Sequence, residues 1–290
     1  MADDDLLLGY EKDENELWLW DDLPELHMEV GYRINRLLHF ERSAYQEISV
    51  AETSAFGRML VLDGVPQITE KDGYIYNEMI SHIGLLTHPN PQYVAMIGGG
   101  DCGPAREAAR YPDIKRIDVV EIDPRVTDVC QRLFNRSRAA ALDPRITIFH
   151  EDGARWIQKQ RERIDVLLID RSDPFGPAAV LYSRAFYQHV YSSLSYDGIA
   201  VFQSGSPFFD MKGLKTTYHR LQSLFPIVRT YVTSIPSFPG GIWSFTVASK
   251  RHDPLAANTD KLPAGTRYMN KAIARSAFAL PEYIQDALRT

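Results

Sequence analysis

The fold class is most readable in the segment Tyr93-Val94-Ala95-Met96-Ile97-Gly98-Gly99-Gly100-Asp101-Cys102-Gly103. Its first five residues are an apolar run, which is typical of a buried parallel strand. Glycines at 98, 100 and 103 follow in the spacing G-x-G-x-x-G, which in nucleotide-binding α/β folds turns a strand into a helix. The same glycines also allow a helix to pack closely on a sheet. The loop alone is therefore a weak indication of nucleoside binding.

Strands and helices alternate on the C-terminal side of this loop. We expect strands at 93–97, 117–122, 146–149, 164–169 and 199–202, and helices at 104–110, 124–134, 154–161, 183–193 and about 211–224. Two more strands at 227–232 and 242–248, and a short helix at 281–288, follow from apolar patterning. This alternation predicts an α/β fold with a mostly parallel sheet and helices on both faces.

The N-terminal part of the chain has a different pattern. Residues 1–16 are acidic, and we expect them to be mobile. Short segments of alternating character, such as 46–51, and the turn signal Asp63-Gly64 predict a small antiparallel β domain over 17–73. A helical spacing from Tyr74 opens the second, catalytic domain, which we place at 74–290.

Composition narrows the classes of function. The chain has 290 residues and a formal net charge of −6, which argues against a nucleic-acid partner and is compatible with a cationic small substrate. Two isolated cysteines, Cys102 and Cys130, and scattered histidines predict neither disulfides nor a metal site. The acidic N-terminus and the lack of an apolar run of about 20 residues predict a cytoplasmic protein with no membrane partner.

Two acidic residues at strand ends extend the nucleoside hypothesis. Glu121 ends the strand after the glycine loop, where its carboxylate can accept hydrogen bonds from both ribose hydroxyls. Asp152-Gly153 ends the third strand, where the aspartate can accept from an adenine amino group. An alternative role for Asp152 is to cap the helix that begins at Ala154.

Asp101 restricts which nucleoside fits. An aspartate inside the loop repels a pyrophosphate, because two like charges about 4 Å apart at an effective dielectric near 20 cost about 4 kcal/mol. The cofactor should therefore lack phosphates, as S-adenosylmethionine does, which disfavours a nicotinamide-dependent dehydrogenase. Asp101 fits better still with a donor that has lost its carboxylate and keeps its amine.

A pair of acids follows the apolar run at 164–169. Asp170 and Asp173 lie at the carboxyl end of that strand, where open α/β sheets bind their ligands. Two carboxylates at this position are suited to bind a cationic amine and to accept its proton. Their alternative role is to cap a turn. The Pro/Gly loop that follows at 174–181 is placed to enclose a pocket.

Together these motifs resemble the spermidine synthases, or polyamine aminopropyltransferases. The resemblance runs from about Trp18 to Leu288 and includes the motifs at 62–67, 76–79, 98–101, 120–123, 152–153, 170–177 and 235–236. It implies a β domain followed by a Rossmann-like methyltransferase fold, usually in a homodimer or homotetramer. It also implies transfer of an aminopropyl group from decarboxylated S-adenosylmethionine to a diamine, with putrescine as the default acceptor, giving spermidine and methylthioadenosine without a prosthetic group.

The resemblance assigns roles to residues position by position. Asp170 is implied as the proton acceptor. The implied substrate contacts are Gln67, Tyr76, Asn77, Asp101 and Asp173. The implied nucleoside contacts are Gln46, Gly98, Gly100, Glu121, Asp152, Gly153 and Pro177.

Three departures from the family pattern leave the acceptor open. Asn77 replaces a common glutamine or histidine, Phe238 a common tyrosine, and Gly205 a common glutamate. Cadaverine, agmatine or a longer amine are therefore alternatives to putrescine as the acceptor. Two other readings are a methyltransferase of the same fold that uses S-adenosylmethionine, and a polyamine-binding protein without activity.

Overall fold

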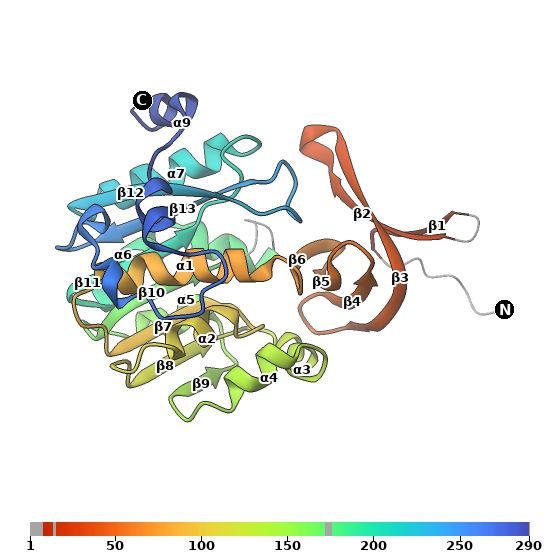
Figure 1. Cartoon of the computed structure of the whole chain (residues 1–290), viewed down its shortest axis with the longest axis horizontal. Coiled ribbons are helices and arrows are strands. Elements are labelled where there is room, and N and C mark those ends of the chain that lie inside the picture. Colours follow the sequence, from red (N-terminus) through yellow and green to blue (C-terminus); the bar gives the residue numbers. More distant parts are fainter. Residues whose placement is uncertain (1–7, 14–15, 172–175, 290) are drawn as a thin grey trace. The chain divides into compact units, whose positions relative to one another are not determined.

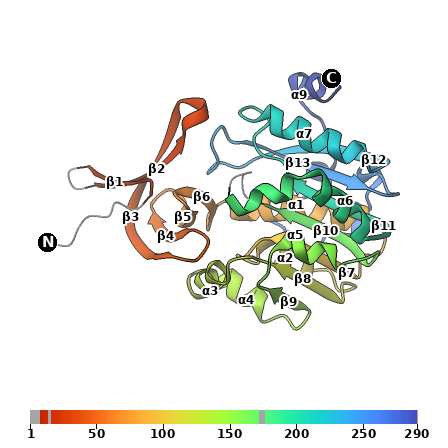
Figure 2. The same cartoon turned by 180° about the vertical axis from the view of Figure 1, so that it is seen from behind.

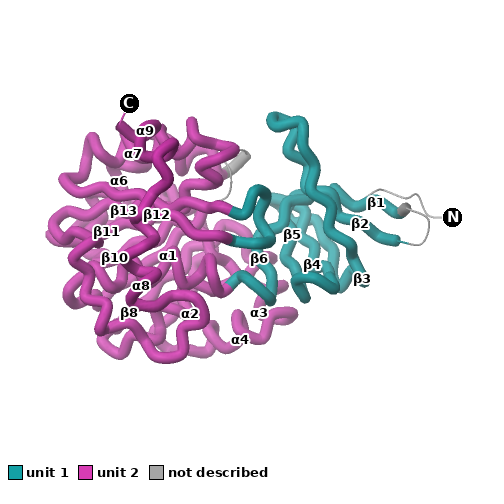
Figure 3. The backbone as a smooth tube through the Cα atoms, turned by 45° about the horizontal axis from the view of Figure 1, so that its top comes forward, with its two compact units in different colours: residues 1–73, 235–241 teal, residues 74–234, 242–290 magenta. Residues whose placement is uncertain are grey.

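The computed structural model describes residues 8–13, 16–171 and 176–289. The chain divides into two compact units, which Figure 3 shows in two colours. Unit 1 comprises Met1–Gly73 and Ile235–Gly241, and unit 2 comprises Tyr74–Ser234 and Ile242–Thr290.

In its described residues, unit 1 is a six-stranded antiparallel sheet whose strands neighbour one another in chain order. The strands are β1 (Tyr10–Asp13), β2 (Glu16–Leu23), β3 (Met28–Arg42), β4 (Glu47–Thr53), β5 (Gly57–Leu62) and β6 (Val65–Thr69), with a short 3-10 helix, η1 (Pro24–Leu26). Its core includes Leu19, Ala51, Met59 and Val61, which are fully buried. Met59 and Val61 share one face of β5 because side chains alternate along a strand.

A hairpin that is distant in the sequence completes unit 1. The backbone N–H of Ser237 donates to Asp72 Oδ2 at 2.7 Å, and the Ser237 hydroxyl donates to Asp72 Oδ1 at 3.0 Å. The Tyr32 hydroxyl donates to the Ser237 carbonyl at 2.7 Å. Residues 235–241, which join two strands of unit 2, thus belong with unit 1. No pattern in the sequence predicts this placement.

Unit 2 is built on a seven-stranded sheet in the order β12-β13-β11-β10-β7-β8-β9. The strands are β7 (Tyr93–Gly98), β8 (Arg116–Val120), β9 (Ile146–Phe149), β10 (Ile164–Asp170), β11 (Leu194–Gln203), β12 (Ile227–Ser234) and β13 (Ile242–Ser249). The five strands from β11 to β9 are parallel, and β13 runs antiparallel to both its neighbours. The predicted fold class is confirmed.

Helices cover both faces of this sheet, as Figures 1 and 2 show from opposite sides. One face packs on α1 (Gly73–Thr87), α2 (Gly103–Ala109), α4 (Asn135–Ala141) and α8 (Lys271–Ser276). The other packs on α5 (Gly153–Gln158), α6 (Arg184–Ser193) and α7 (Met211–Gln222). In β7, Val94 and Met96 face the first layer while Ala95 and Ile97 face the second. Both faces are apolar because both are covered.

The remaining elements are short. They are α3 (Pro124–Leu133), α9 (Glu282–Arg289) and the 3-10 segments η2 (Gly176–Tyr182), η3 (Pro254–Ala256) and η4 (Thr259–Lys261). In α9, Ile284 and Leu288 pack with Leu214 of α7. In the described part of the chain, no helix combines the length and the apolar character that a membrane span requires.

Besides the short 3-10 segments, three of the elements in the described residues were not predicted. Strand β1 lies within the segment expected to be mobile, and Tyr10 in it is buried, its hydroxyl 2.9 Å from Ser49 Oγ. That segment's residues 1–7 and 14–15 lie outside the described residues. Helices α4 and α8 are also additional; each is short and lacks the repeated apolar stripe that reveals an amphipathic helix.

The topology places a switch point at the centre of the sheet. From β7 the chain proceeds to β8 and β9 on one side, and then returns to β10 and β11 on the other. Ligands of open α/β sheets bind at such a point, outside the carboxyl ends of the strands. Here those ends are Gly98 and Asp170, which are paired residues of β7 and β10.

Candidate active site

The glycine loop begins where β7 meets β10. Gly98 has φ +84°, and a Cβ atom there would lie 1.9 Å from the carbonyl oxygen of Asp170. No other residue fits this conformation and this close approach. The loop then enters α2, with Cys102 in the left-handed conformation at its N-cap. The glycine spacing therefore brings the loop directly against the end of β10.

Helix α1 places Tyr76 and Asn77 beside this loop. The Tyr76 hydroxyl donates a hydrogen bond to Asp170 Oδ1, and its ring meets Phe245 edge-on at 5.3 Å between ring centroids. Asn77 is buried, and a Cβ atom on Gly103 would lie 2.2 Å from Asn77 Nδ2. The helix thus contacts both the start of α2 and the end of β10.

Glu121 follows β8 and holds the loop from the other side. Its Oε2 accepts from the backbone N–H of Gly100 at 3.2 Å, and its Oε1 accepts from that of Asp123 at 3.0 Å. Asp123 in turn caps α3 by accepting from Arg125 N at 2.9 Å. The carboxylate of Glu121 is therefore fixed beside Gly100 by two backbone donors.

Three carboxyl groups in this site resist ionisation. Burial raises the pKa of Asp170 to about 7; the Tyr76 hydrogen bond opposes this, while the charges of Asp101 and Glu121 add to it. Burial likewise raises the pKa of Glu121 to about 7. The pKa of Asp101 is also raised by burial, against backbone hydrogen bonds and the charge of Arg106. A bound cation would favour the ionised form of all three.

Asp152 has the capping role that the sequence left open as an alternative. Its Oδ1 accepts from Ala154 N at 2.8 Å at the start of α5. Gly153 lies against Ile97, since a Cβ there would lie 2.4 Å from the Ile97 side chain. The adenine contact predicted for Asp152 stays a prediction.

The roles predicted for four further residues stay predictions. Gln46 and Gln67 belong to unit 1, where Gln46 lies in the turn before β4 and Gln67 Nε2 donates to Val65 O at 3.0 Å. Pro177 lies in η2, and Asp173 lies outside the described residues. Of the departures, Phe238 belongs to unit 1, and Gly205 follows β11 in unit 2.

Two structurally important residues were quoted in motifs but given no role. Glu78 is buried and accepts from the backbone N–H groups of Arg267, Tyr268 and Met269 at 2.8–2.9 Å. Arg171 is buried directly after Asp170. No pattern in the sequence predicts that either side chain is buried.

The start of α3, by contrast, can be predicted from the sequence, because the capping residue Asp123 is followed by Pro124.

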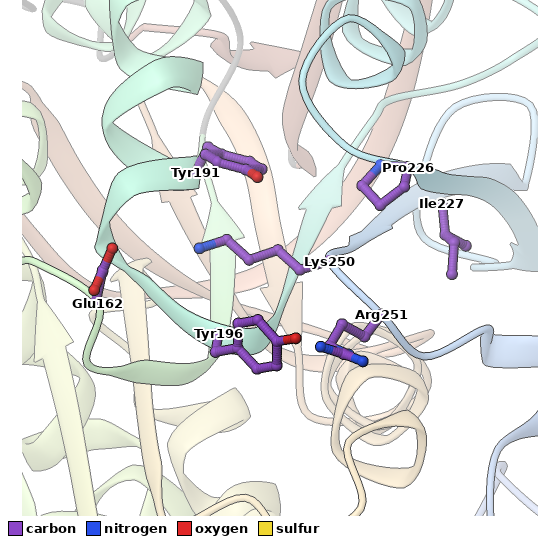
Figure 4. Close-up of a pocket in the computed structure, with 7 residues that line it drawn as sticks. All are labelled: Glu162, Tyr191, Tyr196, Pro226, Ile227, Lys250 and Arg251. Carbon is purple, nitrogen blue, oxygen red and sulfur yellow. The ribbon is translucent and has the colours of Figure 1, made fainter.

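A separate pocket of about 580 Å³ lies at the opposite ends of the strands, before β10 and after β13 (Figure 4). The Lys250 ammonium lies 4.5 Å from the centre of the Tyr191 ring, and the Arg251 guanidinium 4.2 Å from that of Tyr196. Both cations thus already contact aromatic rings. The pocket contains none of the predicted site residues, so we place the candidate site at the switch point.

The fold and the site define an α/β protein of the methyltransferase-like type with a site suited to a cationic ligand. The spermine/spermidine synthase domain model matches residues 73–259, and the spermidine synthase tetramerisation domain model matches residues 22–70. The polyamine aminopropyltransferase of Moorella thermoacetica is 40% identical over 273 residues, 94% of this chain and 96% of that protein. That of Bacillus mycoides is 37% identical over 94% of this chain and all of its own.

Solved structures agree with these sequence matches. A spermidine synthase in complex with the transition-state analogue AdoDATO has a TM-score of 0.92 and 31% identity, covering 96% of this chain and 98% of its own. The spermidine synthase of Thermotoga maritima has a TM-score of 0.91 and 31% identity, covering 96% of each chain. The chain belongs to the spermine/spermidine synthase family. It is an enzyme of the aminopropyltransferase class, as its motifs predicted.

Proposed function

We propose that this enzyme transfers the aminopropyl group of decarboxylated S-adenosylmethionine to a diamine, with putrescine as the first candidate, giving spermidine and methylthioadenosine. The observation that carries the proposal is the cluster of Asp101, Glu121 and Asp170 at the switch point. Glu121 is buried, Asp101 and Asp170 are half-buried, and loss of solvation raises the pKa of all three carboxyls. Such a cluster suits a donor with a sulfonium and an amine, followed by a cationic acceptor.

The donor half of the proposal rests on two carboxylates. Glu121 lies beside Gly100, where a ribose can bind, and Asp101 disfavours both phosphate and carboxylate in the loop. Intact S-adenosylmethionine would bring a carboxylate, and the decarboxylated donor brings only the amine. The related spermidine synthase that binds AdoDATO supports the same choice.

The chemical step requires a neutral amine. An alkylamine with a pKa near 10.4 is neutral in fewer than about one molecule in a thousand at pH 7, and preparing that form costs about 4–5 kcal/mol. The amine nitrogen bonds to the carbon next to the sulfonium, the C–S bond breaks, and its electron pair neutralises the sulfur. The proton lost by the amine goes to Asp170. The Tyr76 hydroxyl keeps the Asp170 carboxyl oriented.

Gly205 leaves the identity of the acceptor amine undecided. This residue has φ +74°, and a Cβ atom there would meet nothing within 4 Å. Its backbone N–H donates to Gln203 Oε1 at 2.7 Å, and Gln203 Nε2 donates to Arg171 O at 2.9 Å, so it is linked to the end of β10. The open space favours cadaverine, agmatine or a longer amine as a second candidate. Asp173 stays the predicted partner of the acceptor amine.

One assay tests the donor and the acceptor together. The protein is incubated with decarboxylated or intact S-adenosylmethionine and with putrescine, cadaverine, agmatine or spermidine, and methylthioadenosine is measured. We expect methylthioadenosine only with the decarboxylated donor, and fastest with putrescine. S-adenosylhomocysteine and a methylated amine would contradict the reaction. A kcat/KM for another amine well above that for putrescine would contradict only the acceptor.

The match to a tetramerisation domain supports oligomer formation. We infer a homotetramer, with a homodimer as the alternative. Light scattering coupled to size-exclusion chromatography distinguishes the two by mass. The cytoplasmic location stays a prediction.

A further inference from the structure

Arg171 is a buried cation next to the proposed proton acceptor. Its residue is 3% exposed, and among the described residues it is the only arginine or lysine that is buried. Its guanidinium makes no ion pair with any described carboxylate. Instead, one terminal nitrogen donates to Leu181 O at 2.7 Å and to Tyr187 Oη at 3.0 Å, and the other donates to Thr217 Oγ1 at 2.9 Å.

Aromatic rings enclose the same guanidinium. Its central carbon lies 3.6 Å from the centre of the Tyr182 ring and 5.5 Å from that of Phe202. The Arg171 carbonyl accepts from Gln203 Nε2 at 2.9 Å. Arg171 therefore connects the end of β10 with η2, α6, α7 and the end of β11.

Burying the Arg171 guanidinium with no carboxylate partner among the described residues costs free energy of folding, so we ask what the buried charge contributes. A buried charge without an opposing charge is destabilising unless hydrogen bonds and polarisable groups compensate for it. Only the planar fork of arginine can donate in two directions while it stacks on a ring, and lysine cannot reproduce this geometry. The backbone that Arg171 fixes is the backbone that carries Asp170. Group transfer is sensitive to displacements of about 1 Å.

We propose that Arg171 is a positioning residue that fastens η2 and α7 to the end of β10 and so fixes the place of the Asp170 carboxylate. The inference rests on the proposed function, because it takes Asp170 as the proton acceptor. Arg171 does not touch the reacting atoms in this account. Substitution of Arg171 should therefore lower turnover and leave the affinity for the nucleoside nearly unchanged.

The test compares Arg171→Met with Arg145→Met. Arg145, in the turn before β9, also holds backbone carbonyls: those of Tyr111 and Ile114, both at 3.1 Å, in the segment between α2 and β8. We expect Arg171→Met to lower kcat by about 100-fold, with the calorimetric Kd for methylthioadenosine changed less than about threefold. Arg145→Met should lower the Tm to a similar extent and leave the kcat of the folded enzyme unchanged.

A gentler variant covers the case in which Arg171→Met does not fold. Thr217→Val removes one acceptor of the guanidinium and keeps the side-chain shape, so we expect a few-fold loss of kcat at an unchanged Kd for methylthioadenosine. Unchanged kcat in both Arg171→Met and Thr217→Val, or equal losses in Arg171→Met and Arg145→Met, would overturn this inference alone. A wild-type enzyme that transfers no aminopropyl group would overturn the proposed function and this inference with it.

Discussion

The Asp170 carboxyl lies where its charge is disfavoured. Burial is the largest cause, and the neighbouring Asp101 and Glu121 carboxylates add to it, while the Tyr76 hydroxyl works in the opposite direction. A carboxyl whose pKa is raised to about 7 binds a proton far more readily than an ordinary aspartate. The environment thus suits Asp170 to general-base chemistry near neutral pH.

Replacing this carboxyl tests its role directly. Asp170→Asn keeps an oxygen that can accept from the Tyr76 hydroxyl but cannot take a proton. We expect kcat to fall by about 10²–10⁴-fold with near-normal binding of methylthioadenosine. In the wild type, kcat/KM should fall as the pH drops below about 7, where Asp170 becomes protonated. A variant with near-normal turnover would remove Asp170 as the base.

The same raised pKa predicts how stability depends on pH. The folded protein holds the Asp170 proton more tightly than the unfolded chain, whose aspartate has a pKa of 3.8. The ionised group therefore destabilises the fold fully above about pH 7 and ever less as the pH falls toward 3.8. Asp170→Asn should raise the free energy of unfolding by about 1–3 kcal/mol at pH 8 and by less at pH 5.

Urea unfolding at the two pH values measures this difference. Asp128→Asn is the control, because that side chain is 47% exposed on α3. A gain for Asp170→Asn that is the same at both pH values would refute the electrostatic explanation.

At the scale of elements, the glycine loop holds β7 and β10 together at their ends. Gly98→Ala places a methyl group 1.9 Å from the Asp170 carbonyl, so the strands must separate. Gly205→Ala has a similarly positive φ, +74°, but meets nothing within 4 Å. We expect the first to cost more than about 3 kcal/mol or to prevent folding, and the second about 1 kcal/mol. Equal losses in denaturant unfolding would mean that backbone strain alone matters.

Helix α1 is anchored to the C-terminal segment by Glu78. Its carboxylate accepts from three consecutive backbone N–H groups at 267–269. Glu78→Ala would leave these donors without a partner, so we expect a loss of about 3 kcal/mol in the free energy of unfolding. Glu282→Ala is the control, since its side chain is 71% exposed and should change stability by less than about 0.5 kcal/mol. Similar losses for both variants would deny Glu78 this role.

The parts of the fold and of the site that depend on local sequence were predictable. Apolar runs located the parallel strands, and acidic residues just after them located Asp101, Glu121 and Asp170 at one edge, because parallel strands share that edge. Contacts between residues far apart in the sequence were not predictable. Burial of Arg171 depends on partners in η2 and α7, and the place of Ser237 depends on Asp72, which is 165 residues away in the sequence.

At the scale of the whole molecule, the chain passes between the two units three times. The passages follow Gly73, Ser234 and Gly241. A fragment of residues 1–73 would lack the hairpin to which Tyr32 and Asp72 are bonded.

We expect this fragment to be less stable, by about 2–3 kcal/mol, than the same fragment joined to residues 235–241 by a flexible linker. Denaturant titration of the two proteins measures the difference, and Asp72→Ala in the joined form should abolish it. Equal stability of the two fragments would show that the hairpin is dispensable for unit 1.

This discontinuity of unit 1 bears on how the protein is made. A ribosome releases the six strands of unit 1 first, but the hairpin that completes it emerges only after most of unit 2. At 5–20 residues per second the wait is roughly 10–30 s. During that interval the nascent sheet is exposed with the buried Asp72 unpaired by Ser237. The N-terminal unit is thus begun first and finished late, and its sheet waits for residues 235–241 while most of unit 2 is made.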